Sequence, residues 1–198
     1  MKLETIEQRA SYGIGRQMGD QLAQNGFKGV DIEAAAFGLK ASFNGEELHV
    51  NPEDLQEAFN ELTKRLREEQ AAEGKKFLEE NGKRDGVTTT ESGLQYEVMT
   101  AGAADGAKPT TANKVRTHYH GTFIDGKVFD SSVERGQPIE FPVTGVIAGW
   151  TEALQLMTVG SKWKLFIPYN LAYGAQGSPG GIPPYSTLVF EVELIDVL

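Results

Sequence analysis

The apolar residues of this 198-residue chain follow one spacing up to about residue 86 and a different spacing after it. In the first part they recur every three or four residues, as in Leu55, Phe59 and Leu62, which is the period of an amphipathic helix. In the second part they alternate with polar residues, as in Trp163 and Leu165, which is the period of a half-buried strand. We therefore predict an α+β fold with a helical domain at residues 1–85 and a strand-rich domain at 86–198, divided between residues 82 and 92.

Three helices are predicted in the first part. Thr5 and Gln8 have the spacing of a capping box at the start of the first helix, and Asn25-Gly26 marks its end. The second helix starts at Asp31 and stops near Asn44-Gly45. The third starts at Asn51-Pro52, because Asn caps well and Pro at the first helical position loses no useful N–H.

The third helix has no strong stop signal before Asn81-Gly82. Its apolar stripe fades after Leu66, and charged residues take over. A long polar helix of this kind is typical of an exposed connection between domains. We therefore predict a connecting helix over residues 52–81 that belongs to the first domain.

The second part predicts an antiparallel sheet and one short helix. Asp125-Gly126 between apolar residues is a strong hairpin signal. Alternating segments near residues 115–120, 162–167 and 188–194 predict further strands. The helix is predicted from Val146 to about Met157, with Trp150 and Leu154 on one side.

Composition limits the partners and the location. The net charge of −9 disfavours binding to nucleic acid and to anionic membranes, although acidity that only keeps the protein soluble is the simpler interpretation. The chain has no cysteine, and residues 1–9 contain neither an apolar core nor a cleavage site of a secretory signal. No run approaches the roughly 20 apolar residues of a membrane span. We expect a cytoplasmic protein.

Most catalytic and metal-binding patterns are missing from the sequence. His118 and His120 could share a strand face and bind a metal weakly, but a solvated face is the favoured interpretation, and we predict no metal and no cofactor. Gly13, Gly15 and Gly19 approach a dinucleotide-binding fingerprint without the strand that must precede it. Inside a helix these small residues favour close approach of a second helix, as at a subunit interface.

The second part also carries a series of short runs in a fixed order: His118–Gly121, Asp125–Ser132, Val146–Trp150, Met157–Gly160, Ile167–Pro168, Ala172–Gly174, Gly180–Pro184 and Leu188–Leu194. Through these runs the chain from Val115 to Leu198 resembles the FKBP-type peptidyl-prolyl cis-trans isomerases. The whole chain resembles their cytoplasmic bacterial, Mip-like subfamily, in which a helical dimerisation domain precedes the isomerase domain. The resemblance implies an antiparallel half-barrel sheet wrapped on the short helix.

The resemblance also implies the residues of the site. Asp130, Tyr173 and the N–H of Ile147 correspond to the groups that act on the substrate. The proline pocket corresponds to Tyr119, Phe129, Val146, Ile147, Trp150, Tyr173 and Phe190, with Trp150 as its floor. Arg135, Ile139 and Ile182 correspond to the rim and its support, with Arg135 as the side chain that braces Asp130. Ile139, Ser178 and Gly181 depart from the best-known human pattern, which bears on substrate preference.

Two interpretations remain open at this stage. The residues alone also suit an ordinary core, and an FKBP fold could be a binding module or chaperone with little turnover. We expect an isomerase that acts on proline-containing unfolded or nascent proteins, with chaperone-like client binding and with tacrolimus- or rapamycin-type macrolides as inhibitors. The first two helices carry narrow apolar stripes and too little bulk for a core of their own, which predicts a homodimer through this domain.

Overall fold

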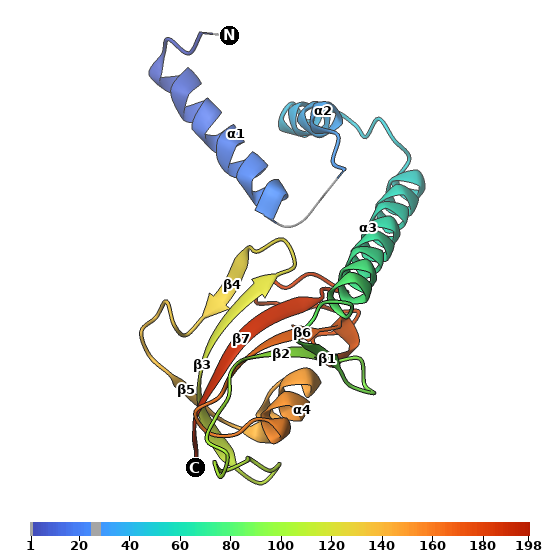
Figure 1. Ribbon diagram of the computed structural model, residues 1–198. Coiled ribbons are helices and arrows are strands. Elements are labelled where there is room, and N and C mark those ends of the chain that lie inside the picture. The colour runs from blue at the N-terminus through green and yellow to red at the C-terminus, as the bar shows by residue number, and fades with distance from the viewer. Residues whose placement is uncertain (1, 25–28) are drawn as a thin grey trace. The chain divides into compact units, whose positions relative to one another are not determined.

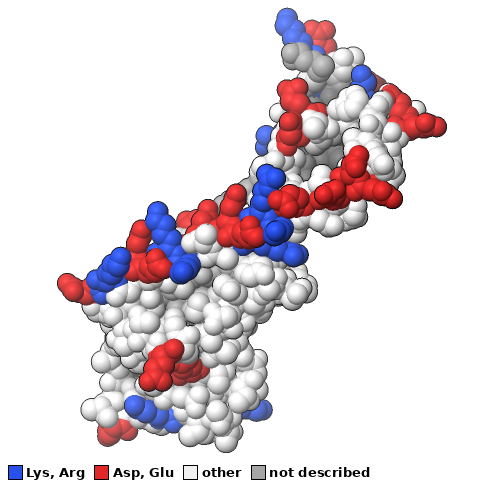
Figure 2. Space-filling model, turned by 90° about the vertical axis from the view of Figure 1, so that its right-hand side faces the viewer, with Lys and Arg blue, Asp and Glu red and all other residues white. Residues whose placement is uncertain are grey.

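The computed structural model describes residues 2–24 and 29–198. The chain divides into two compact units, residues 1–66 and residues 67–198, which are described separately. Within the described residues, no helix combines the length and the apolar character needed to cross a membrane. Figure 2 shows acidic and basic side chains interspersed along the helices, and a broad uncharged area with one small acidic patch on the sheet-bearing unit.

The first unit holds α1 (Ile6–Gln24), α2 (Ile32–Phe43) and the first turns of α3 (Pro52–Asn81). The capping box of α1 is confirmed, because the Gln8 N–H donates to Thr5 Oγ1 and the Thr5 N–H donates to Gln8 Oε1, both at 3.2 Å. Asp31 caps α2 by accepting from two backbone N–H groups at 2.9 and 3.0 Å. The predicted end of α1 at Asn25-Gly26 lies outside the described residues.

The first unit buries almost none of its apolar side chains. Ala41 is the only buried residue among those described in residues 2–66. The exposed large side chains are Ile6, Tyr12, Ile14, Met18, Ile32, Phe37, Leu39, Phe43, Leu48, Val50, Leu55 and Phe59. These helices therefore form no core of their own, as the narrow stripes predicted.

The second unit is an antiparallel sheet with one short helix packed on its core face, together with the last turns of α3 (Figure 1). The strands are β1 (Val87–Thr89), β2 (Gln95–Thr100), β3 (Lys114–Phe123), β4 (Val128–Ser131), β5 (Ile139–Pro142), β6 (Lys162–Ile167) and β7 (Leu188–Val197). Their order is β1-β2-β6-β7-β3-β4, and β5 also pairs with β3. The helix α4 (Ala148–Leu156) follows a single 3-10 turn at Val143–Gly145.

The core of this unit lies between the sheet and α4. Trp150, Ala153 and Leu154 of the helix are buried against alternate residues of the central strands. Leu165 of β6 and Val192 of β7 belong to this face. Along each strand the side chains alternate, so the neighbours of Leu165 and of Val192 point to the other side of the sheet. Each fully buried Leu contributes about 1.5–3 kcal/mol. The sheet stays open and wraps around the helix, so the α+β prediction is confirmed.

The last turns of α3 differ from the exposed connection that the sequence predicts. Gly74 is buried, and a Cβ there would collide with the Thr187 side chain. The ring of Phe77 lies 6.0 Å from that of Phe166, and Asn81 donates to Gln95 Oε1 at 2.8 Å. The compact sheet unit consequently begins at residue 67, inside the helix. A few small and aromatic residues are enough to pack a helix whose composition is polar.

Candidate functional site

A cavity of about 380 Å³ opens between the sheet and the start of α4. It is lined by Tyr119, Phe129, Asp130, Ile139, Phe141, Gly145, Val146, Ile147, Trp150, Tyr173 and Phe190. All seven residues predicted for the proline pocket are among them, together with Asp130 and Ile139. The structure therefore brings together residues that lie up to about 70 positions apart in the sequence.

Pairing within the sheet places these side chains. The turn at Asp125-Gly126 folds β4 back on β3: Gly126 has φ +87°, and the Lys127 N–H donates to Asp125 Oδ1 at 2.9 Å. The register sets Asp130 opposite Gly121, while Phe190 of β7 lies opposite Gly121 on the other side of β3. Three strands thus present their aromatic and acidic residues at one end of the sheet.

The apolar wall is built from rings that meet edge to face. The ring centroids of Trp150 and Phe190 lie 5.2 Å apart at 84°, and those of Phe129 and Phe190 lie 5.4 Å apart at 86°. Tyr119 meets Trp150 at 5.5 Å and 81°. These arrangements are favourable beyond area burial and fix the ring orientations. Trp150, only 4% exposed, forms a flat and rigid floor.

A polar cluster of three side chains lies on one side of the cavity. The Tyr119 hydroxyl donates to Asp130 Oδ2, and Arg135 donates to Asp130 Oδ1 and, at 2.9 Å, to the Tyr119 hydroxyl. Partial burial raises the pKa of Asp130, but the bonds from Tyr119 and Arg135 outweigh it, so this pKa lies below its ordinary value. Burial, followed by the bond to Asp130, raises the pKa of Tyr119. At neutral pH the site therefore presents a carboxylate held by two donors.

Besides the buried indole N–H of Trp150, two hydrogen-bond donors at the cavity have no partner among the described residues. The hydroxyl of Tyr173 forms no hydrogen bond, and its side chain is 39% exposed. Burial and then the Asp130 charge raise the pKa of Tyr173, which keeps the hydroxyl protonated. Ile147 caps α4 with extended backbone, and its carbonyl accepts from Trp150 and Thr151 while its N–H is free. Both donors are available to a bound peptide.

Comparison with known proteins agrees with this geometry. The sequence model of the FKBP-type peptidyl-prolyl cis-trans isomerase domain matches residues 106–195, and that of the domain amino-terminal to it matches residues 7–98. The FKBP-type 22 kDa peptidyl-prolyl cis-trans isomerase of Escherichia coli is 52% identical over 98% of this chain and 97% of its own.

The chain belongs to the FKBP-type peptidyl-prolyl cis-trans isomerases.

Two further matches extend over nearly the whole chain. The outer membrane protein MIP of Legionella longbeachae is 38% identical over 98% of this chain and 87% of its own. The crystal structure of FkpA from Escherichia coli matches with a TM-score of 0.67 and 36% identity, covering 99% of this chain and 98% of that one. The predicted family, fold and isomerase activity are thereby confirmed.

Two residues predicted for the rim and its support, Arg135 and Ile182, do not line the cavity. Arg135 bonds Asp130 and the Tyr119 hydroxyl, which is the contact expected of a side chain that braces Asp130. Ile182 lies in the hydrophobic core, within the segment that joins β6 to β7. Two lining residues, Phe141 and Gly145, were not predicted. Alternation from Ile139 along β5 is the signal that could have indicated Phe141, whereas nothing in the sequence indicates Gly145.

The histidine pair lies on the face of the sheet opposite the core. His118 Nδ1 is 3.0 Å from Ser132 Oγ, and His120 Nδ1 is 3.0 Å from Ser131 Oγ. Across residues 2–24 and 29–198, no group of three or more His, Cys, Asp or Glu side chains is placed to hold a metal ion. The two imidazoles instead hold the serine hydroxyls that follow Asp130 in the chain.

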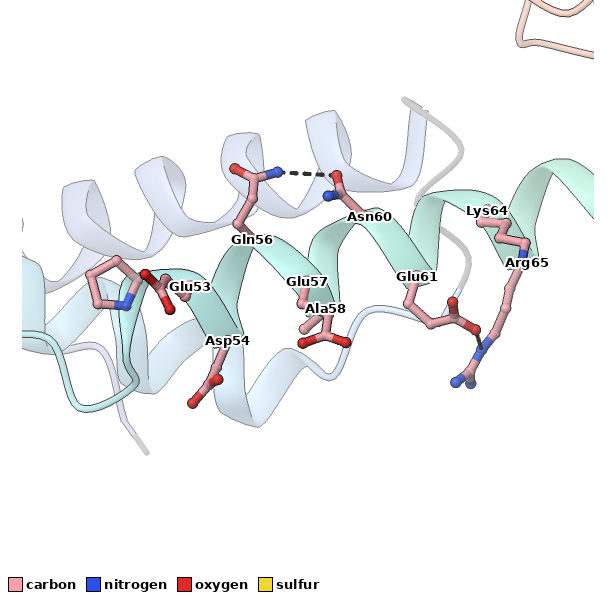
Figure 3. Close-up of a pocket in the computed structure, with 10 residues that line it drawn as sticks. Glu53, Asp54, Gln56, Glu57, Ala58, Asn60, Glu61, Lys64 and Arg65 are labelled. Atoms are coloured by element: carbon pink, nitrogen blue, oxygen red, sulfur yellow. Dashed lines mark hydrogen bonds and ion pairs between the residues drawn. The ribbon is translucent and has the colours of Figure 1, made fainter.

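A larger hollow, of about 1050 Å³, lies along α3 between Pro52 and Arg65 (Figure 3). All its lining residues belong to this one helix, and nearly all are polar or charged. Figure 3 shows Gln56 and Asn60 joined by a hydrogen bond of 3.0 Å, and Glu61 joined to Arg65 at 3.2 Å. These are ordinary contacts of an exposed helix, and we assign no site to this hollow.

Proposed function

We propose that this isomerase places the substrate proline over Trp150, in the 380 Å³ cavity, and accelerates X-Pro rotation there. The observation that supports this proposal is the combination of a rigid apolar floor with unpaired donors at its edge. Trp150 and Phe190 suit the apolar proline ring. Tyr173 and the Ile147 N–H suit the carbonyl groups of the peptide on either side.

The physical chemistry of the reaction suits such a cavity. Rotation about an X-Pro bond breaks amide resonance and has a barrier of about 20 kcal/mol. The planar amide has more charge separation than the twisted one, so an apolar cavity disfavours the ground state more than the transition state. This difference lowers the barrier without a nucleophile or a metal. Asp130 adds a fixed negative charge near the position of the rotating carbonyl.

Relaxation of a Leu-Pro or Phe-Pro peptide from cis to trans tests the site. We expect Trp150→Ala and Asp130→Leu to lower kcat/KM by about tenfold or more, which is the effect of losing roughly 1.4 kcal/mol of transition-state stabilisation. Tyr173→Phe removes an unpaired hydroxyl without disturbing the fold, and it should lower kcat/KM by a smaller factor. Leu156→Ala, on the exposed side of α4, is the matched control.

Trp150→Ala also leaves a void that destabilises the domain by about 3–5 kcal/mol, so circular dichroism must show each variant folded. Unchanged kcat/KM in a folded Trp150→Ala protein would remove the cavity from the mechanism. Unchanged kcat/KM in Asp130→Leu alone would remove only the carboxylate. No acceleration by the folded wild-type protein would favour the alternative, an FKBP-fold binding module or chaperone.

We further propose that the first unit forms a homodimer. Its apolar side chains are exposed, with Ile14 at 60% and Met18 at 40% on the same stripe of α1. Gly15 and Gly19 lie one helical turn apart beside this stripe, and a Cβ at either would meet no described atom within 4 Å. Light scattering at micromolar concentration should give about twice the chain mass of 21.6 kDa. A mass of 21.6 kDa would contradict the dimer.

Three further expectations stay proposals. The exposed apolar helices supply a surface for unfolded clients. Binding of a permanently unfolded protein to residues 1–66 would test this.

Tacrolimus- or rapamycin-type macrolides should compete with the peptide for the aromatic cavity. Inhibition of peptide relaxation by such a macrolide would test this. Fractionation of cells that express the full chain would test the cytoplasmic location.

A further inference from the structure

Gly121 occupies a central position of the sheet beside the cavity, although it is not one of the lining residues. It is buried and faces the core in β3. Its partner on β4 is Asp130 and its partner on β7 is Phe190, so both neighbours line the cavity. The pairing with β4 shifts register directly after it, between Gly121 and Thr122. Glycine within a strand commonly marks such an irregularity or a close approach.

The space where a side chain of residue 121 would lie is filled by two rings. A Cβ there would be 2.7 Å from Phe129 Cζ, 2.9 Å from Phe129 Cε2 and 2.9 Å from Phe190 Cε1. Real Cβ atoms do not approach other heavy atoms this closely. The ring of Phe129 is backed by Phe123 at 5.1 Å and that of Phe190 by Trp150 at 5.2 Å. Both displaced rings border the cavity, so their movement would change its width.

Backbone conformation does not explain this glycine. Gly126 and Gly174 have φ of +87° and +65°, and a Cβ at either would meet nothing within 4 Å. Gly121 shows the reverse, because its φ lies outside the left-handed region and its surroundings are crowded. Residue 121 must be glycine because aromatic ring atoms of the cavity wall fill the space that a side chain would need.

We propose that Gly121 is a positioning residue that sets the width of the proline cavity by letting Phe129 and Phe190 seat against β3. It acts through these two rings and does not touch the substrate itself. A methyl group at residue 121 would move the rings toward the cavity and narrow it for the ring of the substrate imino acid. The inference rests on the proposed placement of the proline over Trp150.

Imino acids of different ring size test this directly. Gly121→Ala should be assayed with three otherwise identical peptides that carry azetidine-2-carboxylate, proline or pipecolate, with four-, five- and six-membered rings. We expect kcat/KM to fall by about tenfold for pipecolate, which corresponds to roughly 1.4 kcal/mol, less for proline and least for azetidine-2-carboxylate. The change should lie mainly in KM, because the narrowing weakens ground-state and transition-state binding together.

Rescue and a matched control separate positioning from stability. Phe129→Leu removes two of the three ring atoms that the new methyl meets, so the double variant should lose less pipecolate activity than Gly121→Ala, each compared with its own Gly121 parent. If Gly121→Ala alone does not fold, the order of losses on the three peptides is measured in the double variant against its Phe129→Leu parent. Gly102→Ala is the control, because its Cβ would lie 2.6 Å from the Val159 carbonyl oxygen, away from the lining residues. It should lower the melting temperature and leave the order of the three peptides unchanged.

Equal losses on all three ring sizes in a folded Gly121→Ala protein would overturn the proposal, and so would no loss on any of them. A reversed order, with the smallest ring affected most, would also overturn it. Full activity of Trp150→Ala would instead show that the proline binds elsewhere. That result contradicts the proposed site whatever Gly121→Ala does, so the two failures are distinguishable.

Discussion

At the scale of single residues, the site combines a charge with groups that hold it in place. Asp130 is bonded by Tyr119 and Arg135, and Arg135 also bonds the Tyr119 hydroxyl, so each member contacts the other two. The Arg135 guanidinium also lies 5.7 Å from the centre of the Tyr119 ring. Such a closed set fixes the direction of the carboxylate more firmly than one ion pair does. Arg135 therefore orients a cavity residue from outside the cavity.

The same set makes catalysis depend on pH in a defined direction. Asp130 has a folded pKa below its ordinary value, so its contribution to stability is present above the unfolded pKa and is lost as pH falls through the folded pKa. In Arg135→Gln the burial that raises this pKa is opposed by the Tyr119 hydroxyl and the Ser131 backbone N–H, without the guanidinium charge. We expect the acid limb of kcat/KM to move to higher pH, since removing an adjacent positive charge raises the pKa of a carboxylate.

The control for this prediction is an arginine–carboxylate pair outside the site. Arg116 and Glu140 lie 2.7 Å apart on the surface of the same sheet unit. Arg116→Gln should leave the acid limb where it is in the wild-type protein. The expectation fails if Arg135→Gln and wild type share one acid limb, because the charge of Asp130 would then not govern the rate. Kinetics over the acid range with a Leu-Pro peptide measures both.

At the scale of helices and strands, local signals predicted where elements begin and end. Asn51-Pro52 starts α3 as predicted, with the Glu53 N–H donating to Asn51 Oδ1 at 3.0 Å. The packing of the last turns of α3 could not be predicted in this way, because the partners of Gly74 and Phe77 are Thr187 and Phe166, about a hundred residues away. No spacing within the helix contains that information.

The site was predictable to the extent that its residues sit in short recognisable runs. Asp130 and Trp150 lie in such runs, and the structure places both at the cavity. Phe141 and Gly145 lie outside them. Phe141 reaches the cavity because β5 pairs with β3, with Phe141 opposite Val115, and Gly145 lies in the 3-10 turn that follows β5. The need for glycine at residue 121 could not be predicted from the sequence either, since it depends on rings from two other strands.

At the scale of the whole molecule, the two units differ in how far they bury their apolar side chains. The sheet unit has a complete core, whereas the helical unit exposes its apolar side chains, up to 90% for Phe43. Such exposed apolar surface on folded helices is typical of an interaction site. If the helical unit joins two chains, each dimer carries two proline cavities on one particle. An unfolded protein with several prolines can then engage both.

Two cavities on one dimer should make long clients better substrates than short peptides. After the first cavity engages a client, the second binds at an effective concentration set by the intervening chain, which can raise apparent affinity by about 10²–10⁴. Ile14→Glu with Met18→Glu charges the exposed stripe of α1 and should give monomers. We expect these monomers to keep peptide kcat/KM within about twofold and to lose about tenfold or more in catalysing the proline-limited refolding of a protein with several prolines.

Mixed dimers separate this effect from client binding by the helices themselves. One wild-type subunit paired with one Asp130→Leu subunit keeps the whole helical surface and has one working cavity. Binding by the helices predicts that half of the wild-type refolding activity remains. Turnover at both cavities predicts a larger loss, because a client held at the inactive cavity gains no rotation there. Both explanations require wild-type dimers to refold the client faster per cavity than the monomeric variant does. Equal rates per cavity would contradict both, and the dimer would then have no part in catalysis on long chains.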